Sequence, residues 1–157
     1  MALELSTAGV TLKYVAEATA GTRPTSGYTA ISSVKSIGDL NPEPSNLDAT
    51  DLSDLEWKRS IPGLKDIGGT VSFTVNMTEA FLTEWAGVVT AFETASAQSS
   101  GKALWFEIAV PGLTKSFFFR GIPVPLGLSE ISVDSILEGN AYITPNKIAG
   151  WADKSTT

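Results

Sequence analysis

Ser32 and Lys35 are the residues of this chain whose types and spacing come closest to a nucleophilic active site. A serine three positions before a lysine can pair a hydroxyl nucleophile with an amine base when the serine opens a helix and motifs such as Ser-Asp-Asn and Lys-Thr-Gly follow. Here the pair lies in a predicted strand, and neither further motif follows. We therefore interpret Ser32 and Lys35 as ordinary polar strand residues and keep a serine hydrolase as a distant alternative.

Asp48, Asp51 and Asp54 suggest a calcium site by type, but their spacing of three does not fit one. An EF-hand loop needs acids at alternate positions, a central glycine and a terminal glutamate. The chain also lacks cysteine and histidine, the usual thiolate and imidazole groups of metal sites and of acid–base catalysis. We expect no enzyme activity, no catalytic residue, no cofactor and no metal. The aspartates are interpreted as a solvated or subunit-facing acidic loop.

The composition is that of a globular protein and predicts a single domain over the 157 residues, of which 43% are hydrophobic and 18% charged. No segment is apolar for long enough to span a membrane, and no N-terminal signal sequence is apparent, so we expect synthesis in the cytoplasm. The formal net charge is −6. Six acids without a base lie between positions 39 and 56: Asp39, Glu43, Asp48, Asp51, Asp54 and Glu56. Because proteins that grip nucleic acid cluster Lys and Arg, we do not expect tight DNA binding.

A strand that leads directly into a helix is the clearest pattern in the chain. Residues 69–77 alternate, with apolar side chains at positions 71, 73, 75 and 77, which predicts a strand with one buried face. From Glu79 the period changes to that of an amphipathic helix. Its predicted apolar stripe consists of Phe81, Leu82, Trp85, Val88, Val89 and Phe92. Asn76, three positions before Glu79, fits a capping box at the helix start.

Further strands are predicted for residues 10–17, 28–40, 103–110, 115–121 and 131–143, the second with the weakest alternation. Phe117, Phe118 and Phe119 are consecutive, so both faces of their strand must meet apolar material from a covering helix or a partner subunit. The predicted fold class is mainly β, with six or seven strands. It is an antiparallel β-sandwich or partly closed barrel with one flanking α-helix over about residues 78–96.

Two long segments lack periodicity. Residues 41–65 are predicted to form a long loop of the kind that is functional or ordered by a partner, and residues 144–157 are also predicted to be loop. Residues 1–9 are predicted to form an N-terminal arm. Trp57 and Trp151 lie in the two unpatterned segments, where a large ring needs a surface to pack on. That surface is either a partner interface or the protein's own sheet.

Four stretches follow one another along the chain: an acidic loop that ends in PGLKDIG (62–68), the strand VSFTVN (71–76), the hairpin GKALWFEIAVPGLTKSFFFRG (101–121) and the closing segment NAYITPNKIAGW (140–151). In this order they resemble the major tail tube proteins of long-tailed, siphovirus-type bacteriophages. The resemblance implies a β subunit with one helix that forms six-membered rings, which stack into a hollow tail whose lumen conducts DNA into the host. It also implies that the sheets of neighbouring subunits join into one β-barrel around the channel.

The resemblance further implies the partners and the location of the protein. The partners would be other copies of the chain in stacked homohexameric rings, the tape measure protein, the tail terminator and the tail-tip or baseplate proteins. DNA would pass through without tight binding. The location would be the tail of the virion, after synthesis in the cytoplasm of the bacterial host.

Candidate site residues follow from this resemblance together with the residue pattern. Residues 41–65 would be an inter-subunit loop, and residues 1–9 and 144–157 would be arms to adjacent subunits. Trp57, Leu64 and Trp151 are candidate assembly-interface residues. The six acids between Asp39 and Glu56 are candidates to line the lumen, because an acidic wall repels phosphates.

Two alternatives to a phage tail tube remain open. One is a tube subunit of a contractile secretion or injection machine. The other is a monomeric β-sandwich that binds carbohydrate through exposed tryptophans.

Overall fold

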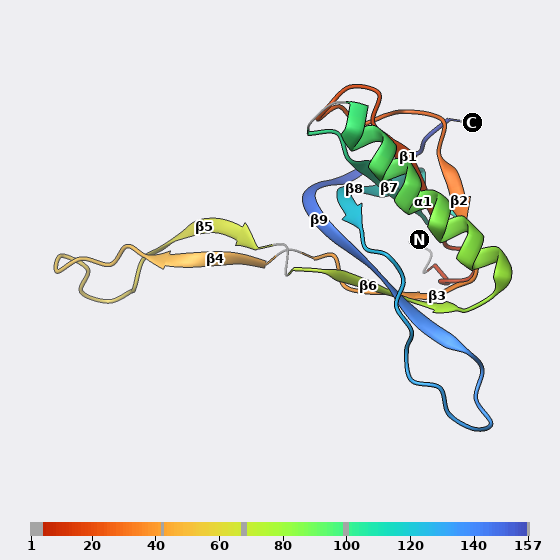
Figure 1. Cartoon of the computed structure of the whole chain (residues 1–157). Helices are drawn as coiled ribbons and strands as arrows, with labels where there is room; N and C mark the ends of the chain where they lie inside the picture. The colour runs from red at the N-terminus through yellow and green to blue at the C-terminus, as the bar shows by residue number, and fades with distance from the viewer. Residues whose placement is uncertain (1–4, 42, 67–68, 99–100, 157) are drawn as a thin grey trace.

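The computed structural model describes residues 5–41, 43–66, 69–98 and 101–156. In chain order they form β1 (Thr11–Ala16), β2 (Thr29–Ile31), β3 (Val34–Ile37), β4 (Glu43–Asp48), β5 (Ser60–Asp66), β6 (Val71–Asn76), α1 (Glu79–Gln98), β7 (Leu104–Ala109), β8 (Lys115–Pro123) and β9 (Glu138–Asp153). Seven strands pair in one sheet in the order β2-β1-β7-β8-β9-β6-β3, and β4 and β5 form a separate hairpin (Figure 1). All of these pairs are antiparallel. The predicted fold class, mainly β with one flanking helix, is confirmed.

The seven-stranded sheet curls until its two edges approach each other. β2 and β3 are the edge strands, yet only Ser32 and Ser33 separate them in the chain. In a flat sheet of this size the edges would lie about 29 Å apart, at about 4.8 Å per strand spacing. Two intervening residues span at most about 11 Å between Ile31 and Val34. The sheet is therefore a partly closed barrel, and the prediction of one strand over residues 28–40 is wrong. Ser33, with a φ of 65°, lies at the turn that carries the chain between the two edges.

The main core lies between the inner face of the sheet and α1. Its largest fully buried side chains are Phe73, Phe81, Trp85, Phe106 and Phe119. β6 alternates as predicted, because Val71, Phe73 and Val75 are buried and Ser72 is exposed. Trp85 fixes the helix further, since its indole Nε1 donates a hydrogen bond of 2.9 Å to the carbonyl of Val124.

The helix begins at a different cap from the predicted one. The hydroxyl of Thr78 accepts a hydrogen bond from the N–H of Phe81 at 3.1 Å, which makes Thr78 the N-cap. Asn76 instead ends β6 and pairs with Glu138 of β9, so the predicted capping box is wrong. Leu82, predicted on the apolar stripe, is exposed, because the buried face of the helix is narrower than the sequence pattern indicates.

β7 and β8 form the predicted hairpin, and both of its faces are covered. On the inner face Phe119 stacks on Phe106, with ring centroids 5.2 Å apart. On the outer face Phe118 contacts the Tyr28 ring edge to face at 5.8 Å, and the Arg23 guanidinium lies 4.3 Å from its centroid. The chain's own loop between β1 and β2 therefore supplies the outer apolar contact at Phe118.

Two segments predicted to be loops are strands. Residues 41–65 contain the β4–β5 hairpin, and residues 144–153 continue β9, which pairs with both β6 and β8. Residues 131–137, predicted to be strand, precede β9 instead. No helix in the described part of the chain has the length and apolar character to cross a membrane.

Candidate functional site

The β4–β5 hairpin extends away from the curled sheet as a separate projection (Figure 1). Its strands pair from Glu43 opposite Asp66 at the base to Asp48 opposite Ser60, and residues 49–59 form its tip. Since strand residues rise by about 3.4 Å each, the six residues of β4 carry the tip about 20 Å beyond the base. The tip therefore lies far from the sheet of its own chain.

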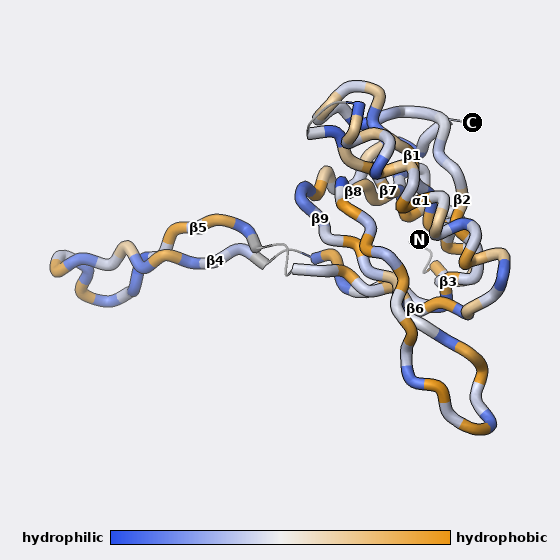
Figure 2. The backbone as a smooth tube through the Cα atoms, viewed as in Figure 1, coloured by the Kyte–Doolittle hydropathy of each residue, from blue (hydrophilic) through white to orange (hydrophobic). Residues whose placement is uncertain are grey.

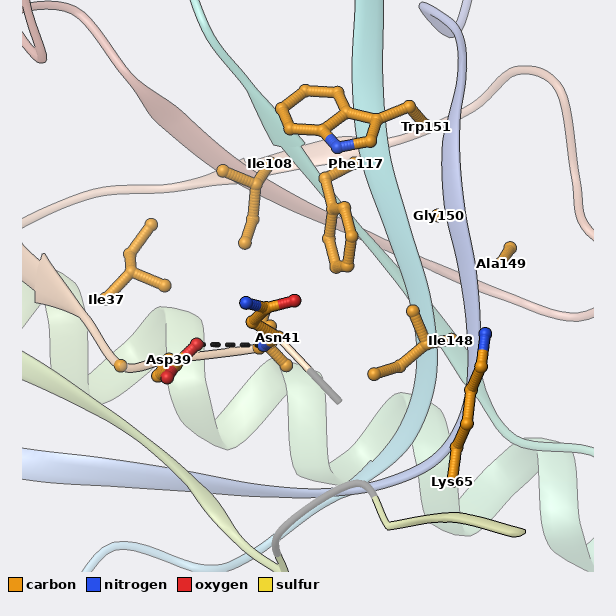
Figure 3. Close-up of a pocket in the computed structure, with 12 residues that line it drawn as sticks. Ile37, Asp39, Asn41, Lys65, Ile108, Phe117, Ile148, Ala149, Gly150 and Trp151 are labelled. Atoms are coloured by element: carbon orange, nitrogen blue, oxygen red, sulfur yellow. Dashed lines mark hydrogen bonds between the residues drawn. The ribbon is translucent and has the colours of Figure 1, made fainter. Parts of the chain in front are cut away.

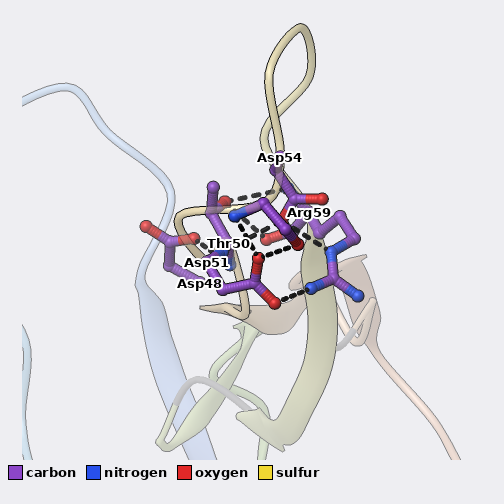
Figure 4. Close-up of polar contacts among 6 residues, drawn as sticks. Asp48, Thr50, Asp51, Asp54 and Arg59 are labelled. Carbon is purple, nitrogen blue, oxygen red and sulfur yellow. Dashed lines mark hydrogen bonds and ion pairs between the residues drawn. The ribbon is translucent and has the colours of Figure 1, made fainter.

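An ion-pair cluster folds the tip (Figure 4). The guanidinium of Arg59 contacts Asp51 through Nη2 and Asp54 through Nε, each at 2.8 Å. The N–H of Asp51 and then the Arg59 guanidinium lower the pKa of Asp54, and the hydroxyl and N–H of Thr50 lower the pKa of Asp48. These carboxylates are ionised at neutral pH and are used to shape the turn. In the described ranges, no group of three or more acidic side chains could hold a metal ion.

Large apolar side chains are exposed along the same hairpin. They are Leu47, Leu52, Leu55, Trp57, Ile61 and Leu64. Figure 2 shows hydrophobic residues along β5 next to the hydrophilic residues of the tip. Trp57 is 81% exposed and Leu64 is 90% exposed, although both are side chains that usually need a packing surface. Exposed apolar patches of this kind are typical of surfaces that contact another molecule.

An apolar groove of about 760 Å³ lies beside the base of the hairpin (Figure 3). Its apolar lining consists of Ile37, Leu40, Ile108, Phe117, Ile148 and Trp151. Trp151 contacts the Phe117 ring edge to face at 5.6 Å and is still 56% exposed. Asp39 and Lys65 are the charged residues of the lining, and Asp39 accepts a hydrogen bond of 2.8 Å from the N–H of Asn41. The groove is an opening into the edge of the main core, since five of its apolar residues pack against that core.

The predicted interface residues lie on two separate surfaces. Trp57 and Leu64 belong to the hairpin, whereas Trp151 belongs to β9 and lines the groove. The predicted acids are also divided. Asp48, Asp51, Asp54 and Glu56 lie at or next to the tip, Asp39 lines the groove, and the side chain of Glu43 is outside the described part of the structure.

Sequence reasoning missed the rest of the groove and a second projection. Ile148 carried a usable signal, because it follows the polar residues Asn146 and Lys147 in a segment otherwise predicted to be loop. The connection between β8 and β9 also exposes apolar side chains, namely Leu128, Ile131, Val133, Ile136 and Leu137. The two strands that this connection joins stay paired at its base, where the N–H of Val124 donates to the carbonyl of Tyr142 at 2.9 Å.

Ser32 and Lys35 are not brought together as a nucleophile and a base. The hydroxyl of Ser32 donates to the carboxylate of Glu84 on α1, at 2.9 Å to Oε2. The ammonium of Lys35 pairs instead with Glu138 of β9. Ser32 therefore links the turn between β2 and β3 to α1, and Lys35 links β3 to β9.

Comparisons with known proteins identify solved structures that share this fold. No family model and no curated protein matches this sequence. A chain in the cryo-EM structure of the anti-feeding prophage cap, the tube terminating cap, is similar with a TM-score of 0.60 and 9% identity, over 98% of this chain and 93% of that chain. A chain in the 6-fold symmetrised cryo-EM structure of the anti-feeding prophage baseplate has a TM-score of 0.60 and 8% identity, over 96% of this chain and 97% of that chain. This chain therefore shares its fold, over nearly its whole length, with chains of a prophage tube cap and baseplate.

Proposed function

We propose that this protein is a structural, non-enzymatic subunit of a phage tail or a related prophage injection apparatus, and specifically a tail tube subunit that assembles into stacked rings. The observation that carries the proposal is the projecting β4–β5 hairpin, whose exposed apolar side chains include Trp57 and Leu64. The fold shared with chains of a prophage tube cap and baseplate supports the same class of assembly. The mechanism in this proposal is self-association, without a catalytic step.

The hairpin and the groove are complementary surfaces that cannot meet within one chain. Lys65, near the end of β5 at the hairpin base, lines the groove, whereas Trp57 lies in the tip. The tip is about 20 Å from that base along a paired ribbon. The exposed apolar side chains of the tip, Trp57 among them, and the apolar groove thus favour contact between successive copies. Such contact is heterologous, and it generates a ring if the rotation closes.

A ring of six copies is the specific arrangement that we propose, with the exposed edges of β2 and β3 covered by neighbouring copies. Unpaired edge strands otherwise invite uncontrolled association, and closure of a ring removes them. The net charge of −6 suits a conduit through which DNA slides, because acidic groups repel phosphates. Asp48, next to the tip, and Glu56, in the tip, are candidates to face the lumen, whereas Asp51 and Asp54 are already paired with Arg59.

Substitution Trp57→Ala tests the proposal. We expect a folded monomer with impaired assembly, since Trp57 is exposed and its loss removes an apolar anchor worth on the order of 2 kcal/mol in a packed interface. The measurement is negative-stain electron microscopy with size-exclusion chromatography at rising protein concentration, and circular dichroism checks the fold. Leu82→Ala is the matched control, because Leu82 is also an exposed apolar residue but lies on α1.

The outcomes separate the rival functions. Rings or tubes from the natural chain and from Leu82→Ala, but not from Trp57→Ala, support the proposal. Equal assembly of both variants contradicts the role of the hairpin. A stable monomer that binds glycans through Trp57 would favour a carbohydrate-binding module. Co-assembly with a sheath protein would favour a contractile injection machine over a long, non-contractile tail.

A further inference from the structure

A second buried cluster lies on the outer face of β7 and β8, away from α1. Trp105, Glu107 and Phe118 are all at most 1% exposed there, although no helix or further sheet covers this face in the described ranges. Part of the cover is the loop between β1 and β2, which places Arg23 and Tyr28 on Phe118. Burial raises the pKa of Tyr28 to about 12, so its hydroxyl stays neutral and donates to the carbonyl of Pro24 at 2.9 Å. The remaining cover must come from elsewhere in the chain.

Residues 154–156, which follow β9, supply the cover over Glu107. Ser155 donates two hydrogen bonds to the carboxylate of Glu107, from its N–H at 3.0 Å and from its hydroxyl at 2.7 Å. On one side Lys154 donates from Nζ to the carbonyl of Val110 at 3.1 Å. On the other side the N–H of Thr156 donates to the carbonyl of Thr25 at 3.0 Å. Three consecutive residues thus join β7, the β7–β8 connection and the β1–β2 loop.

The burial of the Glu107 carboxylate and the position of residues 154–156 depend on each other. Glu107 is 1% exposed, and the ammonium of Lys13 approaches it only to 4.0 Å. A buried carboxylate is costly unless it accepts hydrogen bonds, and bonds to a charged acceptor are stronger than neutral ones. Ser155 supplies two such bonds. Removal of the segment would leave Glu107 without them and would open the outer face to water.

We propose that residues 154–156 form a C-terminal clamp, anchored on Glu107 of the same chain, that closes the outer face of β7 and β8. The clamp also fixes the end of β9, and so holds Trp151 in the wall of the groove. Glu107 acts here as a positioning residue. The occupant of this site is the chain's own segment, bound in cis, and not an arm from another copy. The inference is independent of tube assembly, because every contact that carries it lies within one chain.

Amide hydrogen exchange of the isolated, dilute chain tests the clamp. Ser155→Ala removes one of the two bonds to Glu107 at a half-buried position outside the main core. We expect the amides of Thr156 and of the β1–β2 loop to exchange about tenfold faster, as loss of a charge-assisted hydrogen bond predicts. Amides of Phe106 and Phe119 in the main core should not change. Glu107→Gln should produce the same local pattern, and Ser36→Ala, on an exposed position of β3, is the matched control.

Two results would overturn the inference. One is identical exchange of the Thr156 amide in Ser155→Ala, Ser36→Ala and the natural chain. The other is protection of this amide that disappears on dilution, since it would show that the segment binds a second copy. Both measurements use unassembled protein, so failure of the clamp and failure of the proposed tube function can be told apart.

Discussion

At the residue scale, Glu17 is the side chain whose burial is most heavily compensated. It is 4% exposed, yet its carboxylate accepts hydrogen bonds from the Arg120 guanidinium, from the Trp105 indole at 2.7 Å and from two backbone N–H groups, those of Gly21 and Ala103, at 3.2 Å. Burial alone would raise the pKa of Glu17, but these donors outweigh it, Arg120 most of all, and the pKa lies below its ordinary value of 4.5. The charged form is therefore the one that the fold stabilises.

This shift gives a prediction for stability against pH. A carboxyl whose pKa is lower in the folded state adds stability that is fully present above its unfolded pKa and is lost as the pH falls through the folded value. We expect Glu17→Gln to lose about 3 kcal/mol in the free energy of unfolding at pH 7, because Arg120 then has no anionic partner. Urea unfolding measures this difference, which should shrink as the pH is lowered below 4.5.

The exposed Glu130→Ala is the control for a general effect of charge removal, and its stability should be nearly unchanged at every pH. A Glu17→Gln variant as stable as the natural chain at pH 7 would show that the ion pair only balances its own desolvation.

At the element scale, the close approach of β8 and β9 at Gly121 gives a second prediction. A Cβ added at Gly121 would lie 2.7 Å from Ile143 Cγ2 and 3.0 Å from the carbonyl oxygen of Thr144, which is backbone and cannot swing away. The ladder shifts register there, where Pro145 lies opposite Gly121. We expect Gly121→Ala to destabilise the fold by about 1–3 kcal/mol through this overlap.

Gly127→Ala is the matched control, because an added Cβ there meets nothing within 4 Å and the backbone is not left-handed. It should be neutral or slightly stabilising. Denaturant unfolding with unchanged m-values compares the two variants. Equal midpoints for both would mean that β8 and β9 can separate at Gly121 without loss of pairing.

How well the sequence predicts each element depends on whether a local residue pattern or pairing with another segment specifies that element. β6, α1 and the β7–β8 hairpin are predicted well because their patterns are local: alternation such as Val71 and Phe73, then helical spacing such as Phe81 and Trp85. β4 and β5 carry no alternation and contain Pro44, Pro62 and Gly63, so their strands exist through pairing with each other. No local pattern could indicate that pairing.

The same reason explains the mixed result for the candidate site. Trp57, Leu64 and Trp151 could be singled out as large apolar residues in unpatterned sequence, and all three are exposed. The division between a hairpin and a groove could not be predicted, because Ile37, Ile108 and Ile148 meet only when β3, β7 and β9 are assembled. The Glu107–Ser155 contact joins residues 48 positions apart, so it could not be predicted from the sequence either.

At the scale of the whole molecule, shape and charge act in opposite directions on self-association. The apolar hairpin and groove favour contact between copies, and their contribution grows with the apolar area removed from water. The net charge of −6 opposes contact, since every copy repels every other. Ionic strength separates the two effects, because salt screens exposed charges but leaves apolar contact in place.

We therefore expect assembly to increase with salt. Between about 0.1 M and 1 M NaCl the Debye length falls from about 10 Å to about 3 Å, which removes most of the repulsion between copies. Sedimentation velocity should show a larger assembled fraction at the higher salt concentration, and Trp57→Ala should stay unassembled at both, because its defect is apolar. Dissociation of the natural assembly by salt would instead assign the contact to ion pairs between copies. The acids and Arg59 of the tip would then carry the interface, in place of Trp57 and the groove.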